Sequence, residues 1–187
     1  MKKLLKTTLF FYLLSISLLS YSENIEKLNI KTSHGNIVIE IYPEKAPITV
    51  KNFLNYVDQG FYDGTIFHRI IDGFMIQGGG FDKMMTEKET DAPIKNEANN
   101  GLKNAPYTIA MARTSVPDSA TSQFFINVAN NSFLDYPGQD GAGYCVFAKV
   151  VSGSDVIDLI GKAKTGSSGG HQDVPTEAIM IEEVLSD

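Results

Sequence analysis

An arginine lies inside an apolar segment that ends in three glycines. The segment reads FHRIIDGFMIQGGGF from Phe67 to Phe81, with Arg69 among large apolar side chains and Gly78–Gly80 near its end. An arginine is seldom buried without a partner, and glycines let another chain approach the backbone closely. The pattern is typical of a groove for an extended peptide, with an apolar wall, a bare rim and one fixed positive charge. A buried strand with a surface arginine and a glycine hinge is the alternative that these residues leave open.

Side chains alternate between the two faces of a strand. In a strand from Phe67 to Ile71, Phe67 and Arg69 should therefore share a face, and His68 should lie on the other. In the segment SQFFI the same rule places Gln123 and Phe125 on one face. An amide donor and an aromatic ring would then point the same way, as expected for a second wall of the groove.

Other chemistries receive less support from the residues. Ser122, His68 and Asp72 are the residue types of a serine hydrolase, but the chain has no Gly-x-Ser-x-Gly elbow. The histidines His34, His68 and His171 lack ligand-like spacing, so no metal site is expected. No Lys-Ser or Lys-Thr follows the three glycines, as a phosphate-binding loop would require.

Short β-type segments dominate the chain around these candidates. LNIKT and IVIEI flank a Ser-His-Gly-Asn turn and predict a hairpin over 28–41. One helix is predicted from Pro47 to Gly60 by its apolar spacing and its terminal residues, and another begins at Ser154. Further strands are predicted at 65–71, 74–77, 108–112, 123–128, 144–151 and 179–184, with a polar surface loop over 82–105. This order predicts a mainly β barrel or sandwich, with two helices that could plug the ends of a barrel.

The N-terminus has the features of a secretory signal peptide. Residues 1–22 begin with lysines, continue as a short apolar run and end in Ser-Tyr-Ser. The apolar run is shorter than the roughly 20 residues needed to span a bilayer, although an uncleaved anchor is the alternative. We expect a signal peptide over 1–22 and one domain over 23–187.

The composition limits the classes of partner that the protein is expected to bind. The net charge is −6 and no basic cluster is present, which argues against nucleic acid as the main partner. The single cysteine, Cys145, lies in an apolar run and is expected to be a small buried side chain rather than a nucleophile.

Long contiguous motifs make the sequence similar to the cyclophilin-type peptidyl-prolyl cis-trans isomerases. They cover the chain from about Asn29 to Glu183 and comprise FHRIIDGFMIQGGGF, PIKNEANNGL (Pro93–Leu102), TIAMART (Thr108–Thr114), SATSQFFINVANNSFLD (Ser119–Asp135) and GYCVFAKVVSGSDVID (Gly143–Asp158). The MART and GYCVF segments resemble the bacterial class, including its exported members.

The resemblance implies a closed eight-stranded antiparallel β-barrel capped by two α-helices, with the active groove on its outer face. It implies catalytic roles for Arg69, Gln77 and Gln123. It also implies a substrate-binding surface that consists of Phe74, Met75, Ala112, Arg113, Phe125, Phe133, Leu134 and Tyr144. No cofactor and no metal are implied.

Several positions depart from the family pattern. Phe133 stands where eukaryotic members usually have tryptophan, and Tyr144 where they have histidine. Pro106-Tyr107 stands where a glycine is expected before TIAMA. Arg113 stands at a position where many members have asparagine.

The resemblance and the N-terminal pattern together imply an exported isomerase that assists folding of other exported proteins in the periplasm. Its expected partners are proline-containing unfolded or exposed segments. Neither nucleic acid nor a stable membrane insertion after signal cleavage is expected, and the protein is expected to be a monomer. A barrel that binds peptides without isomerising them is the alternative, and the set Arg69, Gln77 and Gln123 argues against it.

Overall fold

A β-hairpin begins the part of the chain that the computed structural model describes, residues 27–186. β1 (Lys27–Thr32) pairs antiparallel with β2 (Gly35–Ile41) through every residue of β1. The apolar side chains at alternate positions of both strands are buried in the core. The hairpin predicted from the sequence is therefore confirmed, because the period-2 pattern of apolar residues has one face to bury.

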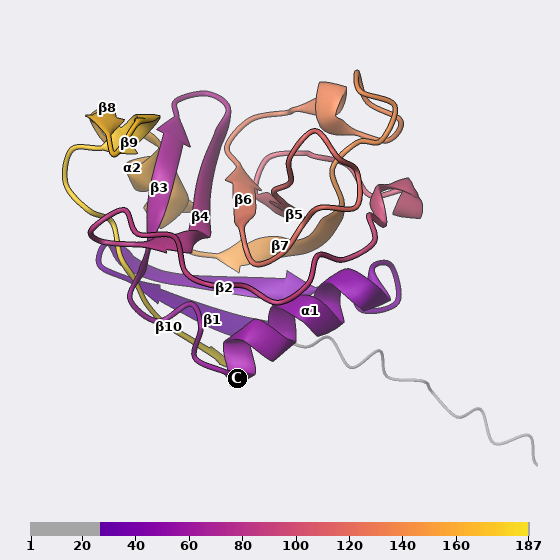
Figure 1. Cartoon of the computed structure of the whole chain (residues 1–187), viewed down its shortest axis with the longest axis horizontal. Coiled ribbons are helices and arrows are strands. Elements are labelled where there is room, and N and C mark those ends of the chain that lie inside the picture. The colour runs from indigo at the N-terminus through magenta and orange to yellow at the C-terminus, as the bar shows by residue number, and fades with distance from the viewer. Residues whose placement is uncertain (1–26, 187) are drawn as a thin grey trace, which may run out of the picture.

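Eight strands form one antiparallel sheet in the order β10-β1-β2-β7-β5-β6-β4-β3 (Figure 1). The other strands of this sheet are β3 (Thr65–Ile71), β4 (Met75–Asp82), β5 (Thr108–Met111), β6 (Phe124–Asn127), β7 (Val146–Ser152) and β10 (Ile181–Ser186). The sheet curls so that its two edge strands meet: Phe67 N donates to Ile179 O at 2.9 Å and Gly64 N to Ile181 O at 2.9 Å. The result is a nearly closed eight-stranded barrel, which confirms the expected fold class.

A two-stranded hairpin was not predicted. It consists of β8 (Thr165–Ser168) and β9 (His171–Pro175), and β9 packs against β3. The sequence TGSSGGHQDVP is mostly polar and glycine-rich, without the alternation that marks a half-buried strand. The contact with β3, rather than its own pattern, holds this hairpin in place.

The two predicted helices are present, as α1 (Pro47–Asp58) and α2 (Ser154–Gly161), and two short 3₁₀ turns occur, η1 (Ala98–Asn100) and η2 (Ser132–Leu134). Phe53 of α1 enters the barrel core and contacts Tyr62, Phe124 and Phe147, at ring-centroid distances of 5.0, 5.6 and 5.1 Å. α2 lies behind β3 and β4 in Figure 1 and buries Ile157 and Ile160.

Cys145 is buried in this core, as predicted. Burial raises the pKa of its thiol to about 11, and the Thr49 hydroxyl lies 3.4 Å from its sulfur. A thiol with so high a pKa is almost entirely protonated at neutral pH and is a poor nucleophile.

The predicted signal peptide, residues 1–22, lies outside the described residues. Within 27–186, no helix combines the length and the apolar character that crossing a membrane requires.

A remote carboxylate caps α1. Ala46, at the N-cap position, offers no capping side chain, and Glu97 accepts hydrogen bonds from the backbone N–H groups of Ile48 (3.1 Å) and Thr49 (2.8 Å). The Thr49 hydroxyl also donates to Glu97, at 2.7 Å. A negative charge at a helix N-terminus satisfies free donors and interacts favourably with the helix dipole.

We predict that Glu97→Ala lowers the free energy of unfolding by about 1–3 kcal/mol, because it leaves these donors without their acceptor. Glu97→Gln keeps an acceptor oxygen without the charge and should lose less. Urea denaturation measures both values. Glu89→Ala, at an exposed position of the same segment, is the matched control, and an equal effect of the two alanine variants would contradict the capping role.

Candidate active site

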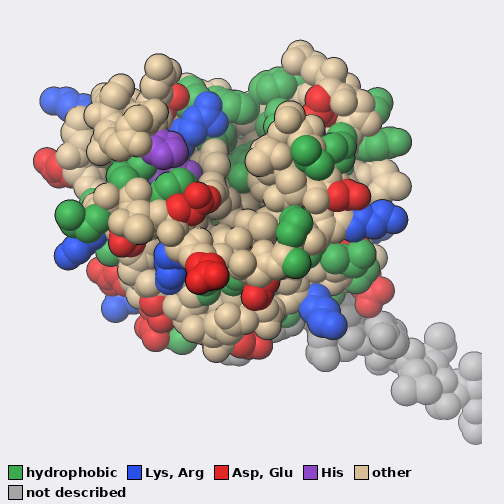
Figure 2. All heavy atoms as spheres, in the orientation of Figure 1, with side chains coloured by type: hydrophobic (Ala, Val, Ile, Leu, Met, Phe, Trp, Pro, Cys, Tyr) green, Lys and Arg blue, Asp and Glu red, His purple; other side chains and the backbone are tan. Residues whose placement is uncertain are grey.

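A small pocket of about 120 Å³ lies on the outer face of the barrel. It is lined by Arg69, Phe74, Met75, Gln77, Ala112, Arg113, Phe125, Leu134 and Tyr144. Figure 2 shows this region as a hollow, with basic and histidine side chains on one side and apolar side chains on the other. Of the predicted site residues, only Gln123 and Phe133 do not line the pocket, and both contact residues that do.

A bulge in β3 turns Arg69 outward. Phe67 pairs with Gly78 of β4, and Arg69 pairs with Gln77, so two steps along β3 match one step along β4. Phe67 is buried in the barrel core, whereas the Arg69 side chain is 42% exposed beside the pocket. The expectation that Phe67 and Arg69 share a face was therefore wrong, because a bulge interrupts simple alternation.

Arg69 has one charged neighbour among the described residues. Its Nε lies 3.7 Å from a carboxylate oxygen of Asp173 on β9, and both side chains are about 40% exposed. The separation exceeds a normal hydrogen bond, so the carboxylate attracts the guanidinium without occupying its N–H donors in a close contact. The donors remain available to a ligand.

The two glutamines are hydrogen-bonded to each other. Gln77 Nε2 donates to Gln123 Oε1 at 3.0 Å, and Gln123 Nε2 donates to a carboxylate oxygen of Glu87 at 3.3 Å. Because an ionised carboxylate only accepts hydrogen bonds, Glu87 determines the orientation of both amides. Gln77 consequently keeps its own oxygen free to accept an N–H from a peptide.

The apolar wall combines residues from separate segments. Met75 and Phe125 are buried on the outer face of β4 and β6, and Phe74 and Leu134 pack against them. Phe133, which is 45% exposed, stacks on Phe74 at 5.6 Å. The backbone of Phe74 is fixed by a hydrogen bond, which its carbonyl oxygen accepts from the Asn131 side chain at 2.9 Å.

The remaining wall is formed by Ala112 and Arg113, which follow β5, and by Tyr144, which follows the loop 136–143. Ala112 N donates to Gln123 O at 2.9 Å, which joins this wall to the glutamine pair. Arg113 extends from Ala112, and its guanidinium lies over the Tyr144 ring at 4.2 Å. Tyr144 in turn meets Phe125 edge-on, with 5.8 Å between the ring centroids.

Each of the three glycines in β4 has a close neighbour. A Cβ on Gly78 would lie 2.9 Å from the Phe67 ring, and Gly79 has a positive φ of 83° between Phe124 and Tyr62. At Gly80 a Cβ would lie 2.5 Å from Gln123 Cγ. The bare backbone therefore has two uses: it allows the core rings to pack against β4, and it leaves room for the Gln123 side chain.

The hydrolase alternative is not supported by the geometry. His68 Nδ1 and Ser122 Oγ are both buried without a hydrogen-bond partner, so they do not bond to each other. Asp72 is exposed and accepts from Lys162 at 2.7 Å. Burial lowers the pKa of His68 to about 4, helped by electrostatic interactions with His171 and Arg69 nearby, and its ring packs against Phe81. Over residues 27–186, no group of three or more His, Cys, Asp or Glu side chains is placed to hold a metal ion.

The departure at Tyr107 has a conformational consequence. Tyr107 has a φ of 65°, in the left-handed region that glycine adopts without cost. Its backbone N–H donates to Asn127 O at 2.7 Å, and its hydroxyl donates to Asp158 on α2. These contacts offset the strain, so the loop keeps the glycine-type conformation without glycine.

The sequence interpretation missed three carboxylates around the pocket: Asp173 beside Arg69, Glu87 beside Gln123, and Asp140, which pairs with Arg113. Each is 27 or more positions from its partner in the sequence. No local pattern marks them, and only a comparison of charge across the folded barrel could have identified them.

Fold and site together define the class: a β-barrel with an outer peptide groove, a small apolar pocket and a solvent-accessible arginine at its edge. The comparisons with known proteins agree. Residues 27–185 match the family described as cyclophilin type peptidyl-prolyl cis-trans isomerase/CLD, and the chain belongs to this family. Like its relatives, it is a peptidyl-prolyl cis-trans isomerase acting on proline-containing peptides.

The curated relatives are similar over almost all of the described chain. Peptidyl-prolyl cis-trans isomerase B of Escherichia coli (strain K12) is 62% identical over 155 residues, which is 82% of this chain and 94% of the relative. A peptidyl-prolyl cis-trans isomerase of Acinetobacter baylyi is 60% identical over 154 residues, 82% of this chain and 81% of the relative. Because such relatives are named isomerases, the alternative of a barrel that only binds peptides is disfavoured.

A solved structure supports the fold. The cyclophilin-type isomerase of Cryptosporidium parvum, crystallised in the presence of the dipeptide Ala-Pro, has a TM-score of 0.72 and 27% identity. The match covers 86% of this chain and 98% of that chain.

We predict that Gly80→Ala lowers kcat/KM by about tenfold, because the new methyl group displaces Gln123 and breaks its bond to Gln77. Gly80 has no positive φ, so the substitution adds no backbone strain. The measurement is a proline-peptide isomerisation assay, with circular dichroism as a check of folding. Gly166→Ala is the control, since its Cβ would meet nothing closer than 3.9 Å. Wild-type kinetics for Gly80→Ala would contradict the role of the glutamine pair.

Proposed function

We propose that Arg69 is the catalytic group and that it donates a hydrogen bond to the proline nitrogen of a twisted X-Pro bond. Rotation about this bond breaks amide resonance, against a barrier of about 18–20 kcal/mol. In the twisted state the nitrogen becomes pyramidal and regains a lone pair, which a fixed donor stabilises. Neither proton transfer nor a covalent intermediate is required.

The observation that carries this proposal is the half-exposed guanidinium of Arg69 at an apolar pocket. The guanidinium stays protonated at all relevant pH values and presents a rigid set of donors. Its single charged neighbour within the described chain, Asp173, lies at 3.7 Å and leaves donors for the substrate. A buried or fully paired arginine could not make this contact.

One hydrogen bond does not account for the whole acceleration. A 10⁵-fold acceleration corresponds to roughly 7 kcal/mol, whereas a charge-assisted hydrogen bond contributes about 1.5–3 kcal/mol. The remainder must come from positioning and from the exclusion of water, which strengthens the field of the guanidinium. Phe74, Met75, Phe125 and Leu134 provide the apolar surface for this.

The glutamine pair is proposed to hold the substrate backbone. Gln77 has a free amide oxygen, oriented by the chain of hydrogen bonds through Gln123 to Glu87. An extended peptide that donates an N–H to this oxygen would keep one side of the X-Pro bond fixed. The proline ring in the pocket would fix the other side while the carbonyl group turns.

We predict that Arg69→Ala reduces kcat/KM by at least about tenfold, equivalent to about 1.4 kcal/mol of transition-state stabilisation. Arg69→Lys retains a positive charge without the planar set of donors and should be intermediate. A proline-peptide isomerisation assay on residues 23–187 measures both. Lys149→Ala, at an exposed position on β7, is the control. An unchanged rate in Arg69→Ala would reject the catalytic assignment of this residue.

We further propose that the enzyme is exported to the periplasm and assists folding of other exported proteins as a monomer. The support is the pattern of residues 1–22, with basic, apolar and small-residue segments in the order of a signal peptide. Proline isomerisation takes tens to hundreds of seconds without catalysis, so newly exported chains would benefit from an isomerase in their compartment.

We predict that the full-length chain, expressed in a Gram-negative host, yields a periplasmic product whose intact mass corresponds to residues 23–187. Replacing Lys2, Lys3 and Lys6 with glutamate should retain the precursor in the cytoplasm, because a signal peptide needs its basic start. Cell fractionation and mass spectrometry provide the readout. Membrane-bound product of full-length mass would support the uncleaved anchor instead.

A further inference from the structure

The two arginines of the pocket have opposite roles in hydrogen bonding. Arg69 is half exposed, whereas the Arg113 side chain is only 3% exposed. Arg113 donates from Nε and from one terminal nitrogen to Gly143 O, at 3.1 and 2.8 Å, and from the other terminal nitrogen to Thr114 O at 2.9 Å. A further N–H group donates to Asp140. Most donors of Arg113 are therefore used within the protein and are not available to a peptide.

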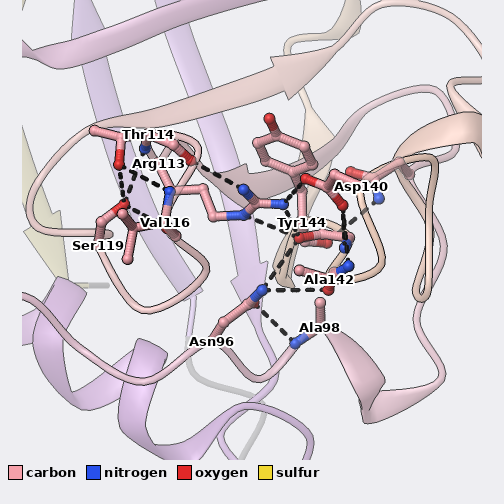
Figure 3. Close-up of polar contacts among 11 residues, drawn as sticks. Asn96, Ala98, Arg113, Thr114, Val116, Ser119, Asp140, Ala142 and Tyr144 are labelled. Atoms are coloured by element: carbon pink, nitrogen blue, oxygen red, sulfur yellow. Dashed lines mark hydrogen bonds and ion pairs between the residues drawn. The ribbon is translucent and has the colours of Figure 1, made fainter.

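Asp140 connects Arg113 to the loop 136–143, which leads directly into Tyr144 of the pocket wall. One of its oxygens accepts from Arg113, and the other accepts from the backbone N–H groups of Ala142 and Gly143, both at 3.0 Å. Figure 3 shows these contacts converging on the loop from one side and Asn96 reaching it from another. The hydrogen bond from Arg113, together with the two backbone donors, lowers the pKa of Asp140 to about 2, so it stays charged at neutral pH.

The loop 136–143 borders a second hollow. This wider depression of about 460 Å³ is lined in part by Asn96, Gly141 and Ala142, whereas Tyr144, which follows the loop, lines the pocket. Asn96 Nδ2 donates to Gly143 O at 3.1 Å, the same carbonyl that Arg113 binds. The carbonyl next to Tyr144 in the chain is therefore held by two side chains, Asn96 and Arg113.

Tyr144 connects Arg113 to the apolar wall of the pocket. The Arg113 guanidinium covers its ring at 4.2 Å, and the ring meets Phe125 edge-on at 5.8 Å. We propose that Asp140 is a positioning and specificity-determining residue of the isomerase: it holds Arg113 against Tyr144, which fixes this wall, and it neutralises the second guanidinium of the pocket. This inference rests on the proposed use of the pocket for the proline ring.

Two effects follow when the carboxylate is removed. A looser wall weakens substrate and transition state alike, so KM rises while kcat changes little. The guanidinium of Arg113 also loses its counter-charge, so peptides with an acidic residue next to proline gain relative to basic ones. A residue with only a scaffold role would produce neither the separation of KM from kcat nor the change in charge preference.

The test compares wild type with Asp140→Asn on tetrapeptides that have Ala, Glu or Lys before proline. We predict a five- to tenfold higher KM for the Ala peptide, with kcat changed less than twofold. The Glu-to-Lys ratio of kcat/KM should rise at least threefold, and 0.5 M NaCl should reduce this rise because salt screens exposed charges. Asp140→Glu should restore both parameters to within twofold of wild type.

Two further variants keep the test decisive. Arg113→Lys retains a positive charge near Asp140 but loses the planar face on Tyr144, so KM should rise without a new preference for Glu. In an Arg113→Ala background, adding Asp140→Asn should change KM less than twofold, because the two residues act as a unit. The control is Glu182→Gln, which removes the exposed pair with Lys31 (3.4 Å) on β1 and β10.

Folded Asp140→Asn with wild-type KM and an unchanged Glu-to-Lys ratio would overturn the proposal, and so would loss of stability alone with both parameters retained. If Asp140→Asn does not fold, wild-type KM in Arg113→Lys would also overturn it. If Arg69→Ala is inactive but Asp140→Asn keeps wild-type KM and charge preference, only the inference about Asp140 fails. If Arg69→Ala is active but Asp140→Asn changes both parameters, only the proposed role of Arg69 fails.

Discussion

The pairing of β3 with β4 is the constraint on which the site depends. A bulge between Phe67 and Arg69 lets one side chain enter the barrel core while the other leaves it, although the two are only two positions apart. The glycines of β4 make the pairing possible, because a side chain at Gly78 would collide with Phe67. The core of the barrel and the position of Arg69 are thus determined by the same few backbone contacts.

The outer face of the barrel has a small apolar cluster of its own, separate from the core. Met75, Phe125 and Val146 are buried in this cluster, whereas Phe133, which stacks on Phe74 at the edge of the pocket, remains 45% exposed. This packing supplies the apolar surface of the pocket. In the proposed mechanism, the apolar side chains also lower the local dielectric response around Arg69, which strengthens the effect of its guanidinium on a twisted amide.

Segments far apart in the sequence bring three carboxylates to the polar side chains of the site. The β8–β9 hairpin brings Asp173 to Arg69, the segment after β4 brings Glu87 to Gln123, and the loop 136–143 brings Asp140 to Arg113. In each case a carboxylate lies beside a polar side chain of the site. Such a side chain is held in place where most of its donors are hydrogen-bonded within the protein, as at Arg113, and is accessible where they are not, as at Arg69.

Residue patterns alone indicated a barrel or sandwich, the two helices and most strands, because periodicity, Pro47 and Gly60 are local signals. The eight-stranded barrel and the full set of groove residues came from the family resemblance that the contiguous motifs carry. Tertiary structure decided what local patterns do not contain: the bulge that separates Phe67 from Arg69, the cap that Glu97 provides to α1, and the β8–β9 hairpin held by β3. It also decided that most N–H donors of Arg113 bind groups of the protein, whereas those of Arg69 remain available. The physical reason is that hydrogen bonds and ion pairs require two groups to be close in space. Residues far apart in the sequence come close only when the sheet closes.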